Sequence, residues 1–213
     1  MRHRYSTFLG SKKTRRPAGF TIVELLIGIV VIGILAVVAM SSFTNAQKNS
    51  RNASRVTAAK EYYKITLAYM QAYSQYPRPH GATQTSCLGY NYVDGDGDGW
   101  PNCFASNNLK NIDYILNTEL KKISPTLPDY PAEPVVGTNG ITYTGVVHRG
   151  MTINGEAGRI ALVYYLEGLS MPCGLGNRLT GGLNTVVTAA AGATDNVSGN
   201  TQCVIAIPKP EDL

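Results

Sequence analysis

A single apolar segment near the N-terminus constrains this chain more than any other feature. The segment from Phe20 to Met40 holds one charged residue, Glu24, and the stretch from Leu25 to Met40 holds none. A helix rises about 1.5 Å per residue, so the segment would span roughly 30 Å, the thickness of a bilayer's hydrocarbon core. The sequence therefore predicts one membrane-spanning helix.

The basic residues are concentrated before this segment. The 213-residue chain has a formal charge of +5, yet residues 1–19 alone hold six Lys and Arg residues and no acid. The remainder holds 13 basic groups against all 14 acids, a formal charge of −1. Because basic flanks stay on the cytoplasmic side, the chain after about Met40 is predicted to lie outside. The near-neutral remainder excludes a basic nucleic-acid-binding domain, so no specific nucleic-acid partner is predicted.

The junction between the basic tail and the apolar segment distinguishes three interpretations. A secretory signal peptide should end in a small-residue cleavage site, which residues 36–39 match poorly, and a plain signal anchor leaves Glu24 unexplained. The sequence RRPAGFTIVELL at residues 15–26 closely resembles the prepilin signal of type IV pilins and pseudopilins. The resemblance implies that a prepilin peptidase cleaves between Gly19 and Phe20 and that Phe20 is then N-methylated.

Glu24 lies one helical turn after Phe20, whose amine becomes a cation once the leader is removed. A carboxylate in hydrocarbon costs of order 2.5–3.5 kcal/mol at a helix centre and less near an end. We expect Glu24 to pair with the amine of a neighbouring subunit, an attraction of roughly 4 kcal/mol at about 4 Å and an effective dielectric near 20. Such a pair would set the register of stacked helices. The alternative is a carboxylate that snorkels to the cytoplasmic interface.

Helical periodicity continues beyond Met40 until proline at Pro77 ends it. Apolar residues recur at intervals of three or four and predict one buried stripe, with Arg55 and Lys60 on the opposite face. The stripe comprises Val56, Ala59, Tyr63, Leu67, Met70 and Tyr73. The predicted organisation is a leader at 1–19, a long helix at 20–76 whose part at about 20–40 is transmembrane, and a globular head at 77–213.

The head is predicted to be small and of the α+β class. Leu109, Ile112, Ile115, Leu116 and Leu120 are spaced as a short helix, with Asn107 or Asn108 as its cap. Three β-rich runs predict an antiparallel sheet packed on the long helix: Ile141–His148, Arg159–Glu167 and Gln202–Ile207. The segment Gly174–Asn200 is expected to form surface loops. Long helix and sheet together are the layout that the resemblance implies, a pilin fold.

Four cysteines lie in the part predicted to be outside, where disulfides persist. They are Cys87, Cys103, Cys173 and Cys203. Three connectivities are possible. We favour the pairs Cys87–Cys103 and Cys173–Cys203, because each closes a loop within one region of the head. In the chain-entropy model these two disulfides would stabilise the folded state by roughly 3 and 3.5 kcal/mol. The second pair resembles the disulfide-bounded C-terminal loop of many pilins.

An aspartate-rich stretch lies inside the first of these loops. Its candidate calcium ligands are the side chains of Asp94, Asp96, Asp98 and Asn102 and the carbonyl of Trp100. Alternating aspartates and glycines match the first half of a calcium loop, and calcium takes six to eight oxygen ligands. An EF-hand would need a glutamate where Ala105 stands, so the loop is closer to those of extracellular calcium modules. Calcium is the one cofactor expected, and a solvated acidic turn is the alternative.

No catalytic signature accompanies these features: the three histidines are scattered, and no known nucleophile, metalloprotease or phosphate-binding motif occurs, so no enzymatic activity is expected.

The resemblance implies a single-pass precursor in the cytoplasmic membrane that polymerises into an extracellular pilus for adhesion, twitching motility or DNA uptake. The implied partners are other pilin subunits, the prepilin peptidase and methylase, and an assembly platform with its ATPase. A pseudopilin or minor pilin of a type II secretion system is the alternative, and a membrane-anchored binding or enzymatic domain a more distant one.

Overall fold

The computed structural model describes residues 19–78, 85–89, 103, 113–131, 133–137, 142–153, 156–175, 177–178, 185–186 and 199–213. The chain divides into two compact units, Met1–Asn45 and Ala46–Leu213. Helix α1 (Ile22–Tyr73) contributes residues to both units.

In the first unit, the described residues leave the apolar side chains of α1 uncovered. Every residue from Gly19 to Gln47 except Gly28 is exposed. The large apolar side chains range from 48% exposed at Val31 to 86% at Phe20. Among the described residues, α1 is the one helix that is long and apolar enough to cross a membrane. So much apolar surface is costly in water, so this segment requires lipid or protein around it.

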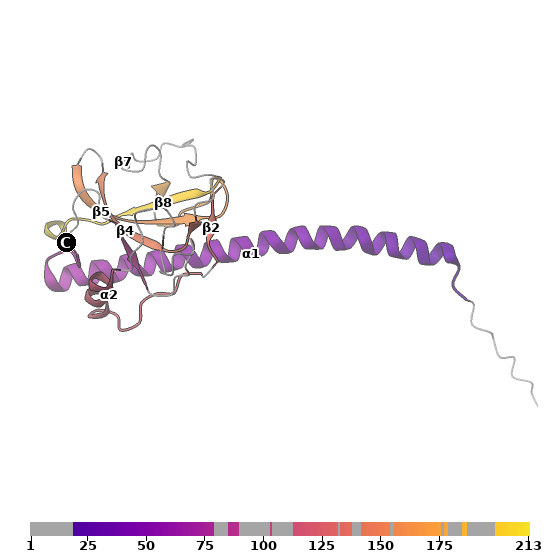
Figure 1. Cartoon of the computed structure of the whole chain (residues 1–213), viewed down its shortest axis with the longest axis horizontal. Helices are drawn as coiled ribbons and strands as arrows, with labels where there is room; N and C mark the ends of the chain where they lie inside the picture. Colours follow the sequence, from indigo (N-terminus) through magenta and orange to yellow (C-terminus); the bar gives the residue numbers. More distant parts are fainter. Residues whose placement is uncertain are drawn as a thin grey trace, which may run out of the picture. The chain divides into compact units, whose positions relative to one another are not determined.

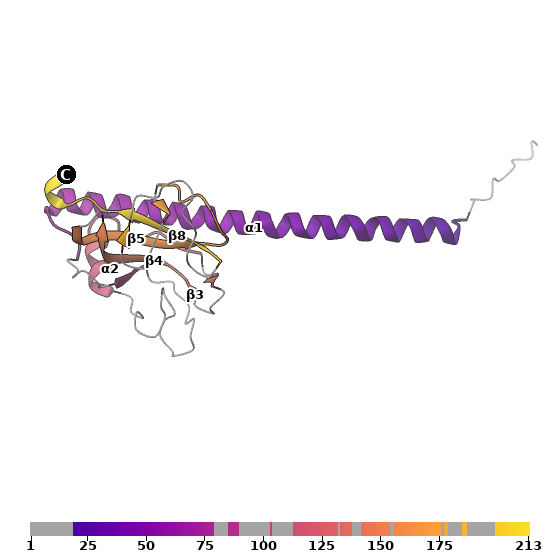
Figure 2. The ribbon, with the colours of Figure 1, turned by 90° about the horizontal axis from the view of Figure 1, so that it is seen from above.

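The second unit contains a sheet that lies beside the second half of α1 (Figures 1 and 2). The strands are β1 (Thr85–Leu88), β4 (Val146–Ile153), β5 (Glu156–Leu166), β8 (Thr201–Ala206) and β6 (Asn177–Arg178), in that antiparallel order, with β7 (Thr185–Val186) parallel to β4. The pair β2 (Val135–Val136) and β3 (Thr142–Tyr143) forms a separate small sheet, and the other helices are α2 (Tyr114–Lys121) and the short η1 (Pro210–Asp212). This architecture confirms the predicted α+β class.

Strand β5 separates two hydrophobic cores because it is buried on both faces. Ile160, Leu162, Tyr164 and Leu166 belong to the core shared with α1 and α2, together with Ala59, Tyr62, Tyr69, Met70, Leu116 and Leu120. Ala161, Val163 and Tyr165 belong to the second core, together with Val147, Met151 and Val204. Burial on both faces explains why β5 reads as a continuous apolar run rather than an alternating one.

The buried face of α1 differs from the predicted stripe. The residues of α1 that are buried are Asn52, Arg55, Ala58, Ala59, Tyr62, Thr66, Tyr69 and Met70. Of the predicted stripe, Ala59 and Met70 belong to this set, whereas Tyr73 is 45% exposed. Arg55, predicted on the outer face, has no exposed surface. Apolar periodicity missed this residue because a buried arginine depends on polar partners supplied from elsewhere in the fold.

Two predicted boundaries were also wrong. Helix α2 begins at Tyr114, and its cap is Asp113, whose carboxylate accepts a hydrogen bond from the backbone N–H of Leu116 at 2.9 Å; Asn107 and Asn108 lie outside the described residues. The run predicted as one strand over Ile141–His148 is divided between β3 and β4. The two residues between these strands, 144 and 145, belong to neither sheet. The N–H of Thr144 instead donates a hydrogen bond to the carbonyl of Cys103.

Two disulfides join loops to the sheet. They are Cys87–Cys103 and Cys173–Cys203, with Cα–Cα distances of 5.6 and 5.5 Å, and these are the pairings that the loop argument favours. The carbonyl of Cys173 also accepts a hydrogen bond from the hydroxyl of Tyr164. The segment that follows β5 is therefore tied to both β5 and β8.

Candidate functional site

The predicted cleavage site lies in exposed chain just before α1. Gly19 and Phe20 precede the first helical residue, Ile22, and neither is buried. A Cβ atom added at Gly19 would meet no atom within 4 Å. The fold therefore places no steric demand for glycine at this position, and a requirement for glycine would come from a processing enzyme.

Thr21 and Glu24 cap the start of α1 reciprocally. The backbone N–H and the hydroxyl of Thr21 donate to Glu24 Oε2 at 2.9 and 2.8 Å, and the Glu24 N–H donates to Thr21 Oγ1 at 3.2 Å. This is a capping box, in which two otherwise unsatisfied backbone donors find acceptors. Sequence reasoning considered Glu24 alone and missed Thr21, although the Thr-x-x-Glu spacing before an apolar run is a known signal.

The cap holds the Glu24 carboxylate beside the residue where cleavage would create a new amine. The N–H that it accepts belongs to Thr21, the residue directly after Phe20. Both side-chain bonds use Oε2, so Oε1 can still accept a hydrogen bond from an ammonium group. The arrangement therefore leaves one carboxylate oxygen of Glu24 available to a cation near the start of α1.

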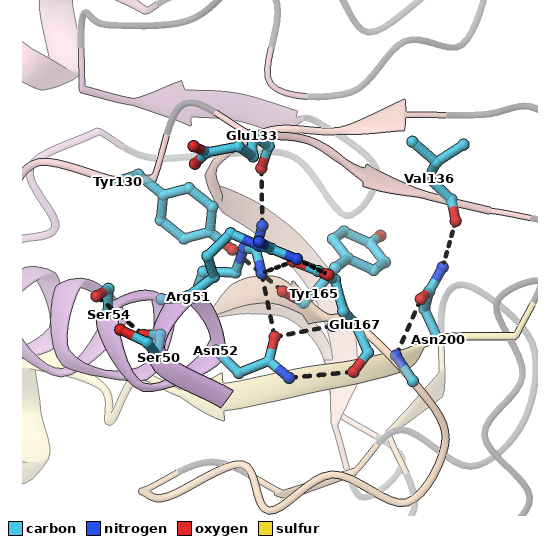
Figure 3. Close-up of polar contacts among 12 residues, drawn as sticks. Ser50, Arg51, Asn52, Ser54, Tyr130, Glu133, Val136, Tyr165, Glu167 and Asn200 are labelled. Carbon is cyan, nitrogen blue, oxygen red and sulfur yellow. Dashed lines mark hydrogen bonds and ion pairs between the residues drawn. The ribbon is translucent and has the colours of Figure 1, made fainter. Parts of the chain in front are cut away.

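A cluster of charged side chains fastens α1 to the end of β5 (Figure 3). Arg51 makes a bidentate contact with Glu167, Nε to Oε1 at 2.7 Å and Nη2 to Oε2 at 2.6 Å. Arg55 Nη1 donates to Glu167 Oε1 at 2.6 Å, and Nη2 donates to the carbonyl of Glu133 at 2.7 Å. Asn52 bonds the backbone of Glu167 on both sides, accepting from its N–H at 2.9 Å and donating to its carbonyl at 3.0 Å.

Two guanidinium groups therefore share one carboxylate in this cluster. The hydrogen bonds from Arg51, opposed by desolvation and reinforced by Arg55, lower the pKa of Glu167 to about 2. The same contact raises the pKa of Arg51. Because Arg55 is fully buried, its charge depends on this partner, and removing one member of a buried pair is strongly destabilising.

The predicted calcium ligands, Asp94 to Asn102, lie outside the described residues. Within the part of the chain that the structure describes, no group of three or more His, Cys, Asp or Glu residues is placed to hold a metal ion. The calcium loop stays a prediction from the sequence.

Comparison with known proteins bears on the N-terminal segment. A family model described as the prokaryotic N-terminal methylation motif matches residues 14–40. The match includes Gly19, Phe20, the Thr21–Glu24 cap and the exposed apolar segment. Neither the curated proteins nor the solved structures gave a match to this chain. Residues 14–40, together with the long apolar helix that they begin, carry the signature of the type IV prepilin family, which pilins and pseudopilins share.

Proposed function

We propose that the mature chain is a structural subunit of an extracellular type IV pilus-like filament, assembled through the apolar part of α1. The observation that carries the proposal is exposure on every side: among the residues that the structure describes, nothing buries any part of the most apolar 18-residue window of α1. A helix that packs on its own head needs one apolar stripe, whereas a helix that is apolar all round belongs in a membrane or inside an assembly. In the precursor this helix would lie in the membrane, and in the filament it would lie among the helices of other subunits.

The energetics of moving the apolar helix from lipid into the filament explain the role that we propose for Glu24. In lipid, the apolar side chains are already removed from water, so association of helices gains from close packing and polar contacts rather than from the hydrophobic effect. Packing alone specifies register poorly along a uniformly apolar surface. The pairing of Glu24 with the amine of Phe20 in a neighbouring subunit would favour one stagger over the others.

The proposed partners follow from this sequence of events. A prepilin peptidase and methylase process the precursor at Gly19 and Phe20, and an assembly platform with its ATPase adds subunits to the filament. Adhesion, twitching motility and DNA uptake are the roles open to such a filament. A pseudopilin of a type II secretion system shares the same N-terminal motif, and abundance of the chain on sheared surface filaments would favour the pilin.

Substitution at Gly19 tests the processing step. We expect Gly19→Val to leave the melting temperature of the head unchanged, because a Cβ atom at this position meets no atom within 4 Å, yet to keep the chain at precursor mass. Gly33→Ala is the matched control, since its Cβ also meets nothing and it lies away from the junction. A Gly19→Val chain of mature mass would contradict the proposal.

We also propose that the loop from Asp94 to Asn102 binds calcium. A ligand present at a hundred times its Kd stabilises the folded state by about 2.7 kcal/mol. We expect chelation to lower the melting temperature of the full chain in detergent, and Asp96→Ala to remove this response. Asp212→Ala, which removes an exposed carboxylate at the C-terminus, should retain it. If neither the chelator nor Asp96→Ala changes the melting temperature, the loop does not bind calcium and is a solvated acidic turn.

A further inference from the structure

A groove of about 740 Å³ lies at the C-terminal end of α1, within the second unit of the chain. The end of α1 forms one side of it, α2 another, and the C-terminal segment at η1 a third. Both views of the ribbon place the C-terminus beside this end of α1 (Figures 1 and 2). Binding sites for small molecules have volumes of about 300–1,000 Å³. We call this site the tyrosine groove, because Tyr69, Tyr73 and Tyr76 line it.

Tyr73 gives the groove an accessible aromatic surface whose position is fixed. Tyr73 is 45% exposed, and its ring centroid lies 4.5 Å from that of Tyr69. Tyr69 is buried, and its hydroxyl donates a hydrogen bond to Glu119 Oε2. Lys122 Nζ lies 5.8 Å from the centroid of the Tyr73 ring. An exposed ring that a buried ring supports can accept the apolar face of a ligand without first having to become ordered.

The two cations of the groove are each paired with a carboxylate. Lys122 Nζ contacts both carboxylate oxygens of Glu119 at 2.7 Å, and Arg78 Nε contacts Asp113 Oδ2 at 2.8 Å. The side chains of Lys122 and Arg78 are 47% and 35% exposed, so both can contact a ligand while they stay paired. Glu211 adds a further carboxylate to the lining. The described residues that line the groove therefore carry no excess of positive charge.

An exposed aromatic ring beside paired charges suits a neutral sugar better than a nucleic acid or a peptide strand. The C–H groups on one face of a pyranose pack against an aromatic ring, while its hydroxyls donate and accept hydrogen bonds. Glu119 and Glu211 supply acceptors for those hydroxyls, and Lys122 supplies donors. A phosphate backbone would require an excess of cations, and an added peptide strand would require a sheet edge, whereas helix ends line this groove.

We propose that the tyrosine groove binds a neutral carbohydrate, with one pyranose ring against Tyr73 and its hydroxyls bonded to Glu119 and Lys122. A largely formed groove with one apolar surface and a few convergent polar groups is the usual form of a small-molecule site. The proposal depends on contacts within the second unit alone. It goes beyond the proposed filament, and either proposal can fail while the other holds.

Saturation-transfer NMR with sugars of defined structure tests this site. The probes are lactose, cellobiose, maltose and N,N′-diacetylchitobiose, each added to the full chain in a detergent that has no sugar headgroup. When the aromatic protons of the protein are irradiated, we expect at least one sugar to receive saturation, most strongly at the axial C–H protons on one face of one ring. Absence of transfer to all four sugars, or equal transfer to both faces of every ring, would overturn the proposal.

Matched variants locate the sugar in the groove. We expect Tyr73→Ala and Glu119→Gln each to raise the Kd of the sugar about tenfold, an effect comparable to the loss of one aromatic contact. Tyr114→Ala is the control for the ring, because Tyr114 is 65% exposed on α2 and is not among the described residues that line the groove. Glu61→Gln is the control for the carboxylate, because Glu61 is exposed on α1 and lines a different groove. Unchanged affinity in Tyr73→Ala, or equal losses in variants and controls, would contradict the assignment.

Further measurements separate binding from folding and from other ligands. If Tyr73→Ala does not fold, Tyr73→Phe, which keeps the ring, should bind the sugar as the unmodified chain does, whereas Tyr73→Leu should not; equal binding by both would overturn the proposal. Oligothymidylate is the competing probe, and its binding in place of every sugar would assign the groove to nucleic acid. Absence of filaments from cells would defeat the proposed function, whereas absence of sugar binding in detergent would defeat only this inference.

Discussion

Glu24→Gln should leave membrane insertion and leader removal intact and reduce incorporation into filaments about a thousandfold. The expected loss is the roughly 4 kcal/mol attraction between the carboxylate and a neighbour's amine. Glutamine serves as well as glutamate in a capping box, so the contacts of residue 24 with Thr21 should persist in this variant. The variant therefore removes the charge and retains the helix start.

A second variant separates the charge from the cap. Thr21→Val removes the hydroxyl that bonds Glu24 Oε2 and the Glu24 N–H, yet keeps the carboxylate. Loss of a cap costs about 1 kcal/mol, so we expect a much smaller fall in incorporation. The measurement is the fraction of each variant in sheared filaments when it is co-expressed with the unmodified chain. Normal filaments from Glu24→Gln would contradict the pairing, and equal defects in both variants would assign Glu24 to the cap alone.

Glu167→Gln should destabilise the head by about 3–5 kcal/mol, because it leaves the buried charge of Arg55 without a counter-charge. For a unit of this size, each kcal/mol lowers the melting temperature by about 2–4 °C, so a fall of about 10 °C is expected. Glu156→Gln is the control. Glu156 pairs with Arg159 at 2.8 Å, but its side chain is 53% exposed, and exposed pairs contribute about 0–1 kcal/mol.

The same pair predicts how stability depends on pH. The pKa of Glu167 falls to about 2 in the folded chain from an ordinary value of 4.5. A lowered pKa contributes stability that is fully present above the unfolded value and is lost as the pH falls through about 2, in this case about 3 kcal/mol. We expect melting temperatures measured from pH 5 to pH 2 to fall more steeply for the unmodified chain than for Glu167→Gln. Parallel curves would show that the contact contributes little.

Local patterns in the sequence predicted the parts of the molecule that depend on neighbouring residues. The apolar segment and the Gly19–Phe20 junction are contiguous in the chain, and the three main strands were found within a few residues because β-rich runs are local. Cys87 and Cys173 were paired correctly with Cys103 and Cys203 because short loop closures are favoured. The Thr21–Glu24 cap was equally local but was overlooked.

Contacts between distant segments were not predictable in the same way. Arg55 was placed on the outer face of α1 because a charged residue reads as solvated, and its partner Glu167 lies 112 residues away. The buried face of α1 therefore includes two polar residues, Asn52 and Arg55, that a search for apolar periodicity could not find. The turn that follows β5 likewise depends on a distant residue, because Gly168 N–H donates to Asn200, which lies 32 residues further along the chain.

The intact mass and first residue of the protein recovered from the cell surface test the central claim most directly. We predict a chain that begins at Phe20, carries a methyl group on its amine and sediments with filaments. A surface protein that begins at Met1 and remains a single subunit would contradict the account.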